Sequence, residues 1–381
     1  MFHKKYTIVI DASRNRSGGS IEYLKNFFKY LKLDSSKIDK VILFSYKNLL
    51  KEIPHRSFLI KYSHPFLEKN ILFQIIWQAF YLPFFLNKNK NNILFTTDST
   101  SFCKFKPSIV FNQDILSFDK EVIKKMPFTL QKLRLYVIRA IQIKALNNAS
   151  KIIFLSNFSK KIVLKTLTKK KNYKIIPHGI ENKLRTLGKK KLKKQSWDFN
   201  KKKIKLIYVS PLFHYKNQIT VAKAYTKLKK KYNNLDIKFV GSYNQSLKIY
   251  NQIINNNPLI TKKNFIGEVN HNKVINLLNE SDIFIFASSC ETFGIALLEA
   301  MALGMPIVCS NKSSLPEILG DGGIYFDPEN ETELYDQINK LIKSKKLKEK
   351  KSKISIKLSL KFTWENNVKH FNDLINSLLK K

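Results

Sequence analysis

The chain has 381 residues, 44% of them hydrophobic, and a formal net charge of +41 from 69 Lys and Arg against 28 Asp and Glu. This length and apolar content suffice for two domains, each with its own core. Only six of the basic residues are Arg. Because recognition of base edges favours the bidentate Arg fork, we expect no nucleic-acid partner. The Lys excess indicates a solvated cationic surface, with attraction to anionic lipid or to a polyanionic acceptor as the functional alternative.

The cysteines and the N-terminus bear on the compartment. Cys103, Cys290 and Cys309 have no paired spacing and no nearby set of His ligands. Neither a disulfide framework nor a metal site is therefore expected. The first apolar stretch, residues 7–10, lacks the length and the cleavage site of a signal peptide. We expect a cytoplasmic protein.

Short apolar runs rich in β-branched and aromatic residues alternate with helical stretches along the whole chain. Strands are predicted at residues 6–10, 41–45, 93–97, 108–111, 151–155 and 174–176, and then at 204–209, 236–240, 264–266, 282–287, 306–309 and 323–326. Near-continuous apolar strands separated by helices are typical of parallel sheets that are covered on both faces. The pattern predicts an α/β protein with two doubly wound, Rossmann-like domains.

The longest apolar segment, residues 71–86, contains Gln74, Gln78 and Pro83. It falls short of the ~20 residues that cross a bilayer, so no transmembrane helix is expected. A buried helix of a large domain is the first expectation. The alternative is an interfacial helix, which would make an anionic membrane surface a partner and place the protein peripherally on the inner face of the membrane.

Residues 181–203 are polar and Lys-dense without a clear apolar period, and we interpret them as the start of an interdomain linker. This puts one domain at residues 1–180 and the other at 181–361. Apolar residues at helical spacing from Trp364 to Leu378 predict a closing amphipathic helix. We expect residues 362–381 to pack back on the first domain.

The fourth predicted strand of the second half leads into the most informative junction, because open parallel sheets bind ligands where their strands end. A loop with Glu291 comes first, and then an apolar helix that contains Glu299. A carboxylate in so apolar a helix needs a partner or a water-filled cleft. Between the two, Phe293, Gly294 and Ile295 would offer backbone N–H groups to a pyrophosphate, and Gly294 would let it approach. The alternative is a solvated Glu299 and a Glu291 that is favoured by the helix dipole.

The spacing Glu291-x7-Glu299, followed by Ala300, Gly304 and Pro306, resembles the signature of the family 4 retaining glycosyltransferases with the GT-B fold. Residues 265–269, 281–288 and 313–328 are also similar to segments of that family, so the resemblance covers almost all of the second half. It implies two Rossmann-like domains that face each other across a cleft. The second domain would bind the nucleotide-sugar donor and the first the acceptor.

The resemblance also implies roles for single residues. In that family the second Glu of the motif binds the ribose hydroxyls, the first lies against the donor sugar, and the backbone amides between them hold the phosphates. Glu299 is then the ribose ligand and Glu291 the sugar-side carboxylate. Phe293, Gly294 and Ile295 supply the amides.

Lys216 is the candidate cation for the donor diphosphate. The family places a basic pair after the first strand of the second domain, and this chain has Lys216 there but Pro211 where Arg is frequent. A Lys at the exit of a strand suits the neutralisation of a leaving diphosphate. The departure at Pro211 implies one charge fewer, or another cation in its place.

The first half carries weaker signals. Gly18 and Gly19 follow the first strand and open a helix, where their N–H groups could reach a phosphate or a sugar. Family members carry such a pair facing the donor and acceptor. Gln113 and Asp114 stand where the family often has a His-containing loop near the acceptor. Asp114 either positions an acceptor hydroxyl or caps a helix, and His178 is expected to shape the hinge at the end of the first domain.

Together these features predict a retaining, metal-independent glycosyltransferase without a cofactor, which needs no protein nucleophile. It would move a hexosyl group, mannosyl or similar, onto a saccharide or lipid-linked saccharide in cell-envelope polysaccharide or lipopolysaccharide synthesis. The alternatives are a basic protein that binds polyanions or lipids, and a nucleotide-sugar epimerase of similar fold.

Overall fold

A computed structural model describes residues 5–16, 18–194 and 203–379. The chain divides into two compact units, the first made of Met1–Gly179 with Trp364–Lys381 and the second of Ile180–Thr363. Each unit is built on one parallel sheet. The α/β class with two doubly wound sheets is therefore confirmed.

The first unit has a seven-stranded sheet in the order β3-β2-β1-β4-β5-β6-β7. Its strands are β1 (Tyr6–Asp11), β2 (Ile38–Phe44), β3 (Leu59–Tyr62), β4 (Asn92–Thr96), β5 (Ser108–Asn112), β6 (Lys151–Phe154) and β7 (Tyr173–Ile175). Its helices are α1 (Gly18–Tyr30), α2 (Lys47–Glu52), α3 (Pro65–Glu68), α4 (Ile71–Ile76), the π-helix η1 (Trp77–Tyr81), α5 (Leu82–Asn87), α6 (Lys120–Lys125), α7 (Leu130–Asn148), α8 (Asn157–Leu164) and α17 (Trp364–Leu379).

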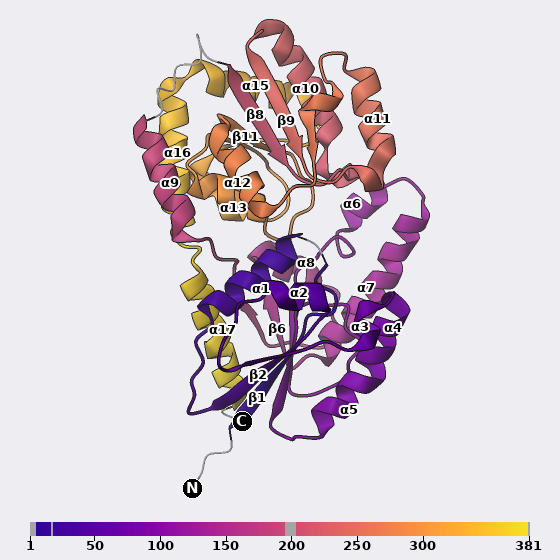
Figure 1. Cartoon of the computed structure of the whole chain (residues 1–381). Coiled ribbons are helices and arrows are strands. Elements are labelled where there is room, and N and C mark those ends of the chain that lie inside the picture. Colours follow the sequence, from indigo (N-terminus) through magenta and orange to yellow (C-terminus); the bar gives the residue numbers. More distant parts are fainter. Residues whose placement is uncertain (1–4, 17, 195–202, 380–381) are drawn as a thin grey trace. The chain divides into compact units, whose positions relative to one another are not determined.

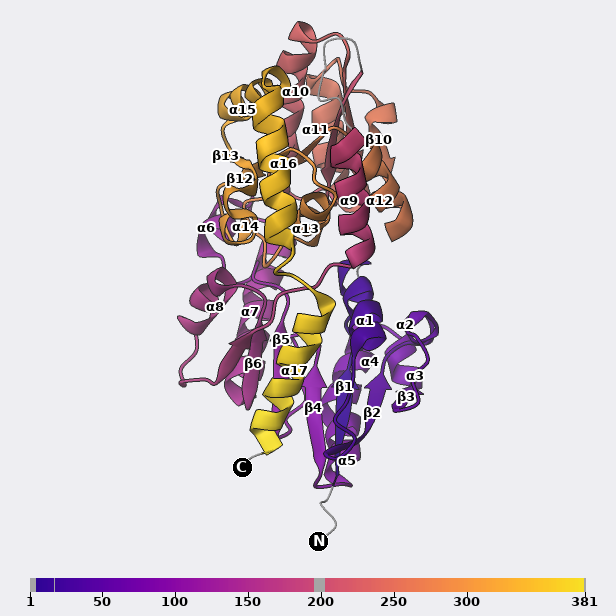
Figure 2. The ribbon, with the colours of Figure 1, turned by 90° about the vertical axis from the view of Figure 1, so that its left-hand side faces the viewer.

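Aromatic side chains bind the closing helix α17 to the first unit. Figure 2 shows α17 beside α1, and the ring of Phe371 lies edge-on to that of Phe27 with centroids 5.0 Å apart. A second cluster joins the sheet to the α4–η1–α5 segment through Trp77, Leu82 and Leu86, all buried against strand residues. The predicted amphipathic helix at the C-terminus is confirmed.

The second unit has a six-stranded sheet in the order β10-β9-β8-β11-β12-β13. Figure 1 shows its neighbouring strands β8 and β9. Its strands are β8 (Ile204–Val209), β9 (Leu235–Val240), β10 (Phe265–Gly267), β11 (Ile283–Phe286), β12 (Ile307–Ser310) and β13 (Ile324–Phe326). Its α-helices are α9 (Asn182–Lys194), α10 (Gln218–Lys231), α11 (Leu247–Asn256), α12 (His271–Glu280), α13 (Ile295–Ala302), α14 (Leu315–Leu319), α15 (Glu331–Lys343) and α16 (Lys345–Ser359), with 3₁₀ turns η2 (His214–Lys216), η3 (Asn244–Ser246), η4 (Lys262–Asn264) and η5 (Gly320–Gly322).

The strand orders locate one switch point in each sheet. In the first unit the chain moves from β1 outward through β2 and β3 and then returns to the other side of β1 with β4. In the second unit β8, β9 and β10 run outward in the same way, and β11 returns to the other side of β8. Ligands of open parallel sheets bind at such points, outside the carboxyl ends of the diverging strands. The loops after β1, β4, β8 and β11 are therefore the places for functional side chains.

Three sequence interpretations need correction. The predicted linker is wrong over Asn182–Lys194, which form α9, and residues 195–202 lie outside the described part of the chain. Strand β3 was not predicted, because only its first residue, Leu59, is buried. The expectation of a buried helix over 71–86 is wrong for its outward face, where Phe80 and Phe84 are exposed.

Candidate functional site

The switch point of the second unit brings Lys216 and Glu291 together. Lys216 ends the 3₁₀ turn after β8, and Glu291 lies in the loop after β11, the strand that pairs with β8. The Lys216 ammonium donates to Glu291 Oε1, and the two side chains are only 11% and 14% exposed. Because little solvent screens these two charges, they attract each other more strongly than they would in bulk water. Two residues predicted to be catalytic thus form one ion pair.

Backbone contacts hold both partners in place. The buried Tyr208 hydroxyl donates to the Lys216 carbonyl oxygen at 2.5 Å, and burial, with the nearby Glu291 carboxylate, raises the pKa of Tyr208 well above its ordinary value. The Glu291 N–H donates to Ser313 Oγ at 3.2 Å, and Ser314 Oγ donates to the Glu291 carbonyl at 2.9 Å. Strand β8 and the loop after β12 therefore hold the two residues of the pair.

Helix α13 follows directly, and Gly294 is its N-cap with φ of +89°. A Cβ at this position would approach Phe286 and Leu315 side-chain atoms at 3.2 Å. The positive φ and this packing favour a glycine at position 294. The approach of a phosphate to its backbone stays a prediction. The first turn of α13, which starts at Ile295, still has backbone N–H groups that the helix itself cannot satisfy, and its dipole favours an anion there.

Phe293 contributes to the site through its position in the core. Its ring is buried and lies edge-on to that of Phe362 in the same unit, with centroids 5.5 Å apart. The side chain thus anchors the loop before α13, so that only the backbone of Phe293 remains as a candidate ligand group.

Glu299 lies on the second turn of α13 and is buried. Its Oε1 is 2.6 Å from Nε2 of His271, the first residue of α12, which is about one-third exposed. The sequence predicted that Glu299 needs a partner or a cleft, and His271 is the partner. His271 was missed, although its place directly after the exit of β10 could have suggested it.

Pro211, which stands where a second cation was considered, contributes a carbonyl group. That oxygen accepts hydrogen bonds from Gln218 Nε2 and from Ser210 Oγ, both at 2.9 Å. The turn after β8 therefore supplies Lys216 as its cation next to Glu291, and Pro211 adds no charge.

The first unit has a pocket of about 480 Å³ at its own switch point. Its lining combines four cationic side chains with two acidic ones, along with amide, hydroxyl and aliphatic groups: Arg14, Arg16, Lys69, Asn70, Ile71, Gln74, Asp98, Thr100, Asp114, Arg134, Ile138 and Gln142. Arg14 follows β1 and Asp98 follows β4, the two strands that diverge there. The pocket therefore carries a net positive charge where the fold places ligands.

Arg14 is held by the turn that Asp11 organises. Asp11 Oδ1 accepts from the Ser13 N–H at 3.0 Å and Oδ2 accepts from Gln78 Nε2 at 2.7 Å, while burial raises the pKa of Asp11. The Nη1 atom of Arg14 is buried and has no hydrogen-bond partner within the described residues. A buried guanidinium nitrogen of this kind can donate a hydrogen bond to an anionic ligand.

The acceptor-side candidates hold turns. Gln113 Nε2 donates to the Thr97 carbonyl at 2.7 Å, and Asp114 Oδ1 accepts from the Leu116 N–H at 2.9 Å. The helix-cap interpretation of Asp114 is wrong, because the next helix, α6, is capped by Asp119. Asp114 does line the pocket.

Gly18 and Gly19 open α1 and are exposed, and nothing lies within 4 Å of a Cβ built at Gly18. They belong to the first unit, as do Gln113 and Asp114, whereas the Glu291 and Glu299 element belongs to the second. The candidates are thus divided between the two units.

His178 is buried near the rings of Tyr23 and Phe111, with centroids 5.2 and 6.2 Å from its own. Burial lowers the pKa of His178 to about 3, so the imidazole is neutral at physiological pH. This environment suits the structural role that the sequence indicated.

Residues 189–357 match the family model described as Glycosyl transferases group 1. These residues lie within the second unit, Ile180–Thr363. That match contains the whole Glu291-to-Glu299 element, and it confirms the family resemblance that the motif predicted.

Known proteins extend this result. An uncharacterized glycosyltransferase of Methanocaldococcus jannaschii is 29% identical over 239 residues, which are 61% of this chain and 59% of the relative. The O-antigen chain mannosyltransferase B of Escherichia coli is 32% identical over 102 residues, 27% of each chain. Each match therefore covers 59% or less of the curated relative's length.

Solved structures support the fold over the full length. Anabaena HepE, crystallised with UDP and glucose, superposes with a TM-score of 0.71 at 18% identity and covers 98% of this chain and 99% of its own. The two Rossmann-like units therefore have the GT-B fold.

Proposed function

We propose that this protein is a retaining glycosyltransferase that moves a hexosyl group, mannosyl or similar, from a nucleotide-sugar to a saccharide or lipid-linked acceptor. The observation that carries the proposal is the element at the switch point of the second unit. There Glu291, paired with Lys216, and the buried Glu299 stand at the two ends of a segment that opens helix α13. The donor of the proposed reaction has a ribose, a diphosphate and a sugar in succession. Glu299, the start of α13 and Glu291 follow one another in the same order.

Glu299 is proposed to bind the ribose hydroxyls. A buried carboxylate that accepts hydrogen bonds from a diol is well suited to this task, and His271 keeps its oxygen oriented. The sugar would lie near Glu291. The diphosphate would lie at the first turn of α13, where the N–H groups of Gly294 and Ile295 favour an anion.

Lys216 is proposed to change partners during donor binding. In the structure its ammonium is held by Glu291. A diphosphate carries more negative charge than one carboxylate, so it competes for the same cation. Lys216 and the helix dipole would then stabilise the charge that develops on the leaving diphosphate, while Glu291 is released to meet the sugar.

The proposed chemistry needs no protein nucleophile, cofactor or metal. The bond from the anomeric carbon to the diphosphate breaks as the acceptor oxygen forms its bond on the same face, through an oxocarbenium-like state. The proton of the acceptor hydroxyl passes to an oxygen of the leaving diphosphate. Holding both substrates in the reactive geometry and stabilising the leaving group supply much of the rate. Retention of configuration follows from attack on the face that the diphosphate leaves.

The acceptor is proposed to enter the pocket of the first unit. Arg14, with Arg16, Lys69 and Arg134, gives this pocket four cations against two carboxylates. An acceptor that bears a phosphate or carboxylate group fits that balance, and the unpartnered Arg14 Nη1 is the group placed to bind it. Asp114 would then contact an acceptor hydroxyl. Gly18 and Gly19, at the start of α1, remain proposed donor-side groups, and Gln113, directly after β5, remains a proposed acceptor-side group.

A role in cell-envelope polysaccharide or lipopolysaccharide synthesis is supported by the match to an O-antigen mannosyltransferase. The complex of HepE with UDP and glucose supports a nucleotide-sugar donor. We propose that the enzyme acts in the cytoplasm, peripherally on the inner face of the membrane when its acceptor is lipid-linked.

Product analysis tests the reaction. The purified full chain is incubated with UDP-, GDP-, ADP- and dTDP-sugars, with and without phosphorylated saccharide acceptors and with EDTA in a parallel series. The proposal expects transfer that depends on the acceptor, persists in EDTA and gives an anomeric proton coupling that matches the donor's configuration. Sugar release or epimerisation without acceptor contradicts the proposal, as does an inverted product.

A further inference from the structure

The α4–η1–α5 segment of the first unit has large apolar side chains on its outward face. Phe80 and Phe84 are 72% and 64% exposed, and Leu72 and Ile76 are exposed as well. On the opposite face, Trp77 and its neighbours fill the core. A helix of a soluble protein normally turns its polar side to water. This segment is therefore apolar on both faces.

The π-helix in the middle aligns the outward side chains. Leu72, Ile76, Phe80 and Phe84 are spaced by four residues, and in a regular α-helix such a row drifts because one turn takes 3.6 residues. The wider π turn over Trp77–Tyr81 takes more residues per turn and rotates the row back. The four side chains thus form one stripe along the segment.

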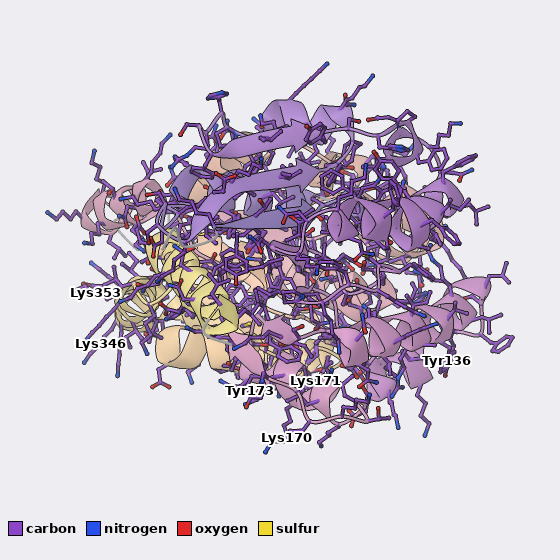
Figure 3. All side chains as sticks on the ribbon, turned by 90° about the horizontal axis from the view of Figure 1, so that it is seen from below. Tyr136, Lys170, Lys171, Tyr173, Lys346 and Lys353 are labelled. Atoms are coloured by element: carbon purple, nitrogen blue, oxygen red, sulfur yellow. The ribbon has the colours of Figure 1, made fainter. Side chains whose placement is uncertain are left out.

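A second apolar stripe lies on α7. Leu130 is 86% exposed, and Leu133, Tyr136 and Val137 are exposed too, at helical spacings of three and four residues. Leu135 is buried on the inward side of the same helix. Figure 3 shows Tyr136 at the margin of the first unit.

The two stripes flank the cationic pocket. Lys69 and Ile71, at the start of α4, line it from one side, and Arg134 and Ile138, on α7, line it from the other. Helices α4 and α7 therefore border the same opening, and the cations of the pocket lie between the two apolar rows.

The chain segments that carry the stripes have basic residues and no acidic ones. The sequence has no Asp or Glu between Glu68 and Asp98, and none between Glu121 and Glu181. The Lys88 ammonium lies over the ring of Phe84, 4.7 Å from its centroid, and that of Lys69 lies over Phe73 at 4.5 Å. Lysines that extend from an aromatic base can keep the ammonium at a phosphate layer while the ring is buried.

We infer that this surface, defined by Leu72, Ile76, Phe80, Phe84, Leu130, Leu133, Tyr136 and Val137, docks the first unit on an anionic lipid bilayer. The apolar rows enter the boundary between head groups and acyl chains, and the surrounding lysines contact lipid phosphates. A second copy of the chain is the less suitable occupant, because like cationic surfaces repel each other. Docking of this kind goes beyond sugar transfer and does not depend on it.

Vesicle co-sedimentation tests the inference on the full chain without any nucleotide-sugar. The wild type is compared with the double variant Phe80→Ser, Phe84→Ser on vesicles of phosphatidylcholine alone and of phosphatidylcholine with phosphatidylglycerol. The matched control is Leu247→Ser, Leu360→Ser, which removes two half-exposed apolar side chains of the second unit. Melting temperatures of all three proteins establish that each is folded.

The wild type and the control are expected to bind the anionic vesicles alike, with weaker binding at high salt and on phosphatidylcholine alone. The Phe80, Phe84 variant should bind at least about tenfold more weakly, because two phenyl groups no longer leave water. Three results overturn the inference. They are no binding of wild type to anionic vesicles, equal binding of the Phe80, Phe84 variant, and a wild-type dimer that this variant dissociates. The first two leave the nucleotide-sugar proposal intact, since donor binding is measured separately.

Discussion

Replacing Lys216 with Met removes the cation that faces Glu291 and keeps most of the side-chain volume. Glu291 then remains in a site where its side chain is only 14% exposed. Two unit charges about 4 Å apart attract by roughly 4 kcal/mol at an effective dielectric constant of 20, and removing one partner of a buried pair costs roughly 3–5 kcal/mol. Because both side chains keep some contact with water, we expect the low end, a loss of about 3 kcal/mol in the free energy of unfolding of the second unit.

Thermal and urea unfolding of four proteins measure this loss: wild type, Lys216→Met, Glu291→Gln and the double variant. A domain of this size shifts its melting temperature by about 2–4 °C per kcal/mol, so Lys216→Met should melt about 6–12 °C lower. The double variant should recover much of the loss, because no uncompensated charge remains buried. A Lys216→Met protein within about 0.5 kcal/mol of wild type, or a double variant as unstable as the sum of the single ones, refutes the reasoning.

Three further predictions concern the first unit and α9. Burial holds the pKa of His178 at about 3 against about 6.5 when unfolded. As pH falls below 6.5, the unfolded chain therefore gains a proton that the folded chain lacks, and the wild type loses about 1.4 kcal/mol of unfolding free energy per pH unit between pH 6 and 4. His178→Phe should lack this loss, which is measured as the difference between the urea-unfolding free energies of wild type and variant across that pH range. If the two proteins lose stability in parallel, the prediction is contradicted. Gly188→Ala should lower the free energy of unfolding by more than about 2 kcal/mol despite the helix preference for Ala, because the new Cβ would lie 2.2 Å from the Ala302 carbonyl oxygen. The control Gly18→Ala should change the free energy of unfolding by no more than about 1 kcal/mol. Equal effects of the two substitutions in thermal unfolding would contradict the packing of α9. Arg14→Met should raise KM for a phosphorylated acceptor about tenfold or more while the donor Kd stays unchanged, and an unchanged KM removes the acceptor from this pocket.

The sheets could be predicted from the sequence because their strands are apolar on both faces. Runs such as Ile283–Phe286 stand out from the polar stretches around them. Strand β3 escapes that criterion, since it lies at the sheet edge and includes Lys61, whose ammonium donates to the Leu50 and Ile53 carbonyls. An edge strand buries too little for its pattern to show.

Helix α9 was missed for a related reason. Its lysines hide a narrow inward face, where Arg185 donates to the Ser359 and Phe362 carbonyls and Gly188 lets the backbone of α13 approach. An Arg and a Gly do not register as an apolar period. Tertiary contacts therefore decide this helix, and composition alone suggested a linker.

The grouping of the second-unit candidates could be predicted because two of them are close in sequence and the third follows a neighbouring strand. Glu291 and Glu299 flank one helix start, and Lys216 follows the neighbouring strand. The pocket of the first unit could not be predicted, because Lys69 and Arg134 reach Arg14 only through the packing of α4 and α7 against the sheet. His271 is a similar case, since its contact with Glu299 joins two helices.

Thermal stabilisation by nucleotide-sugars is the measurement that tests the donor site most directly. UDP-, GDP-, ADP- and dTDP-sugars are added to the wild type, to Glu299→Ala and to the control Glu280→Ala, which removes an exposed carboxylate at the end of α12. A ligand that binds only the folded state stabilises it by about 2.7 kcal/mol at a hundredfold excess over Kd. We predict that one nucleotide class raises the melting temperature of wild type and control but not of Glu299→Ala. No response to any nucleotide-sugar, or an equal response in Glu299→Ala, would contradict the assignment of this site to the donor.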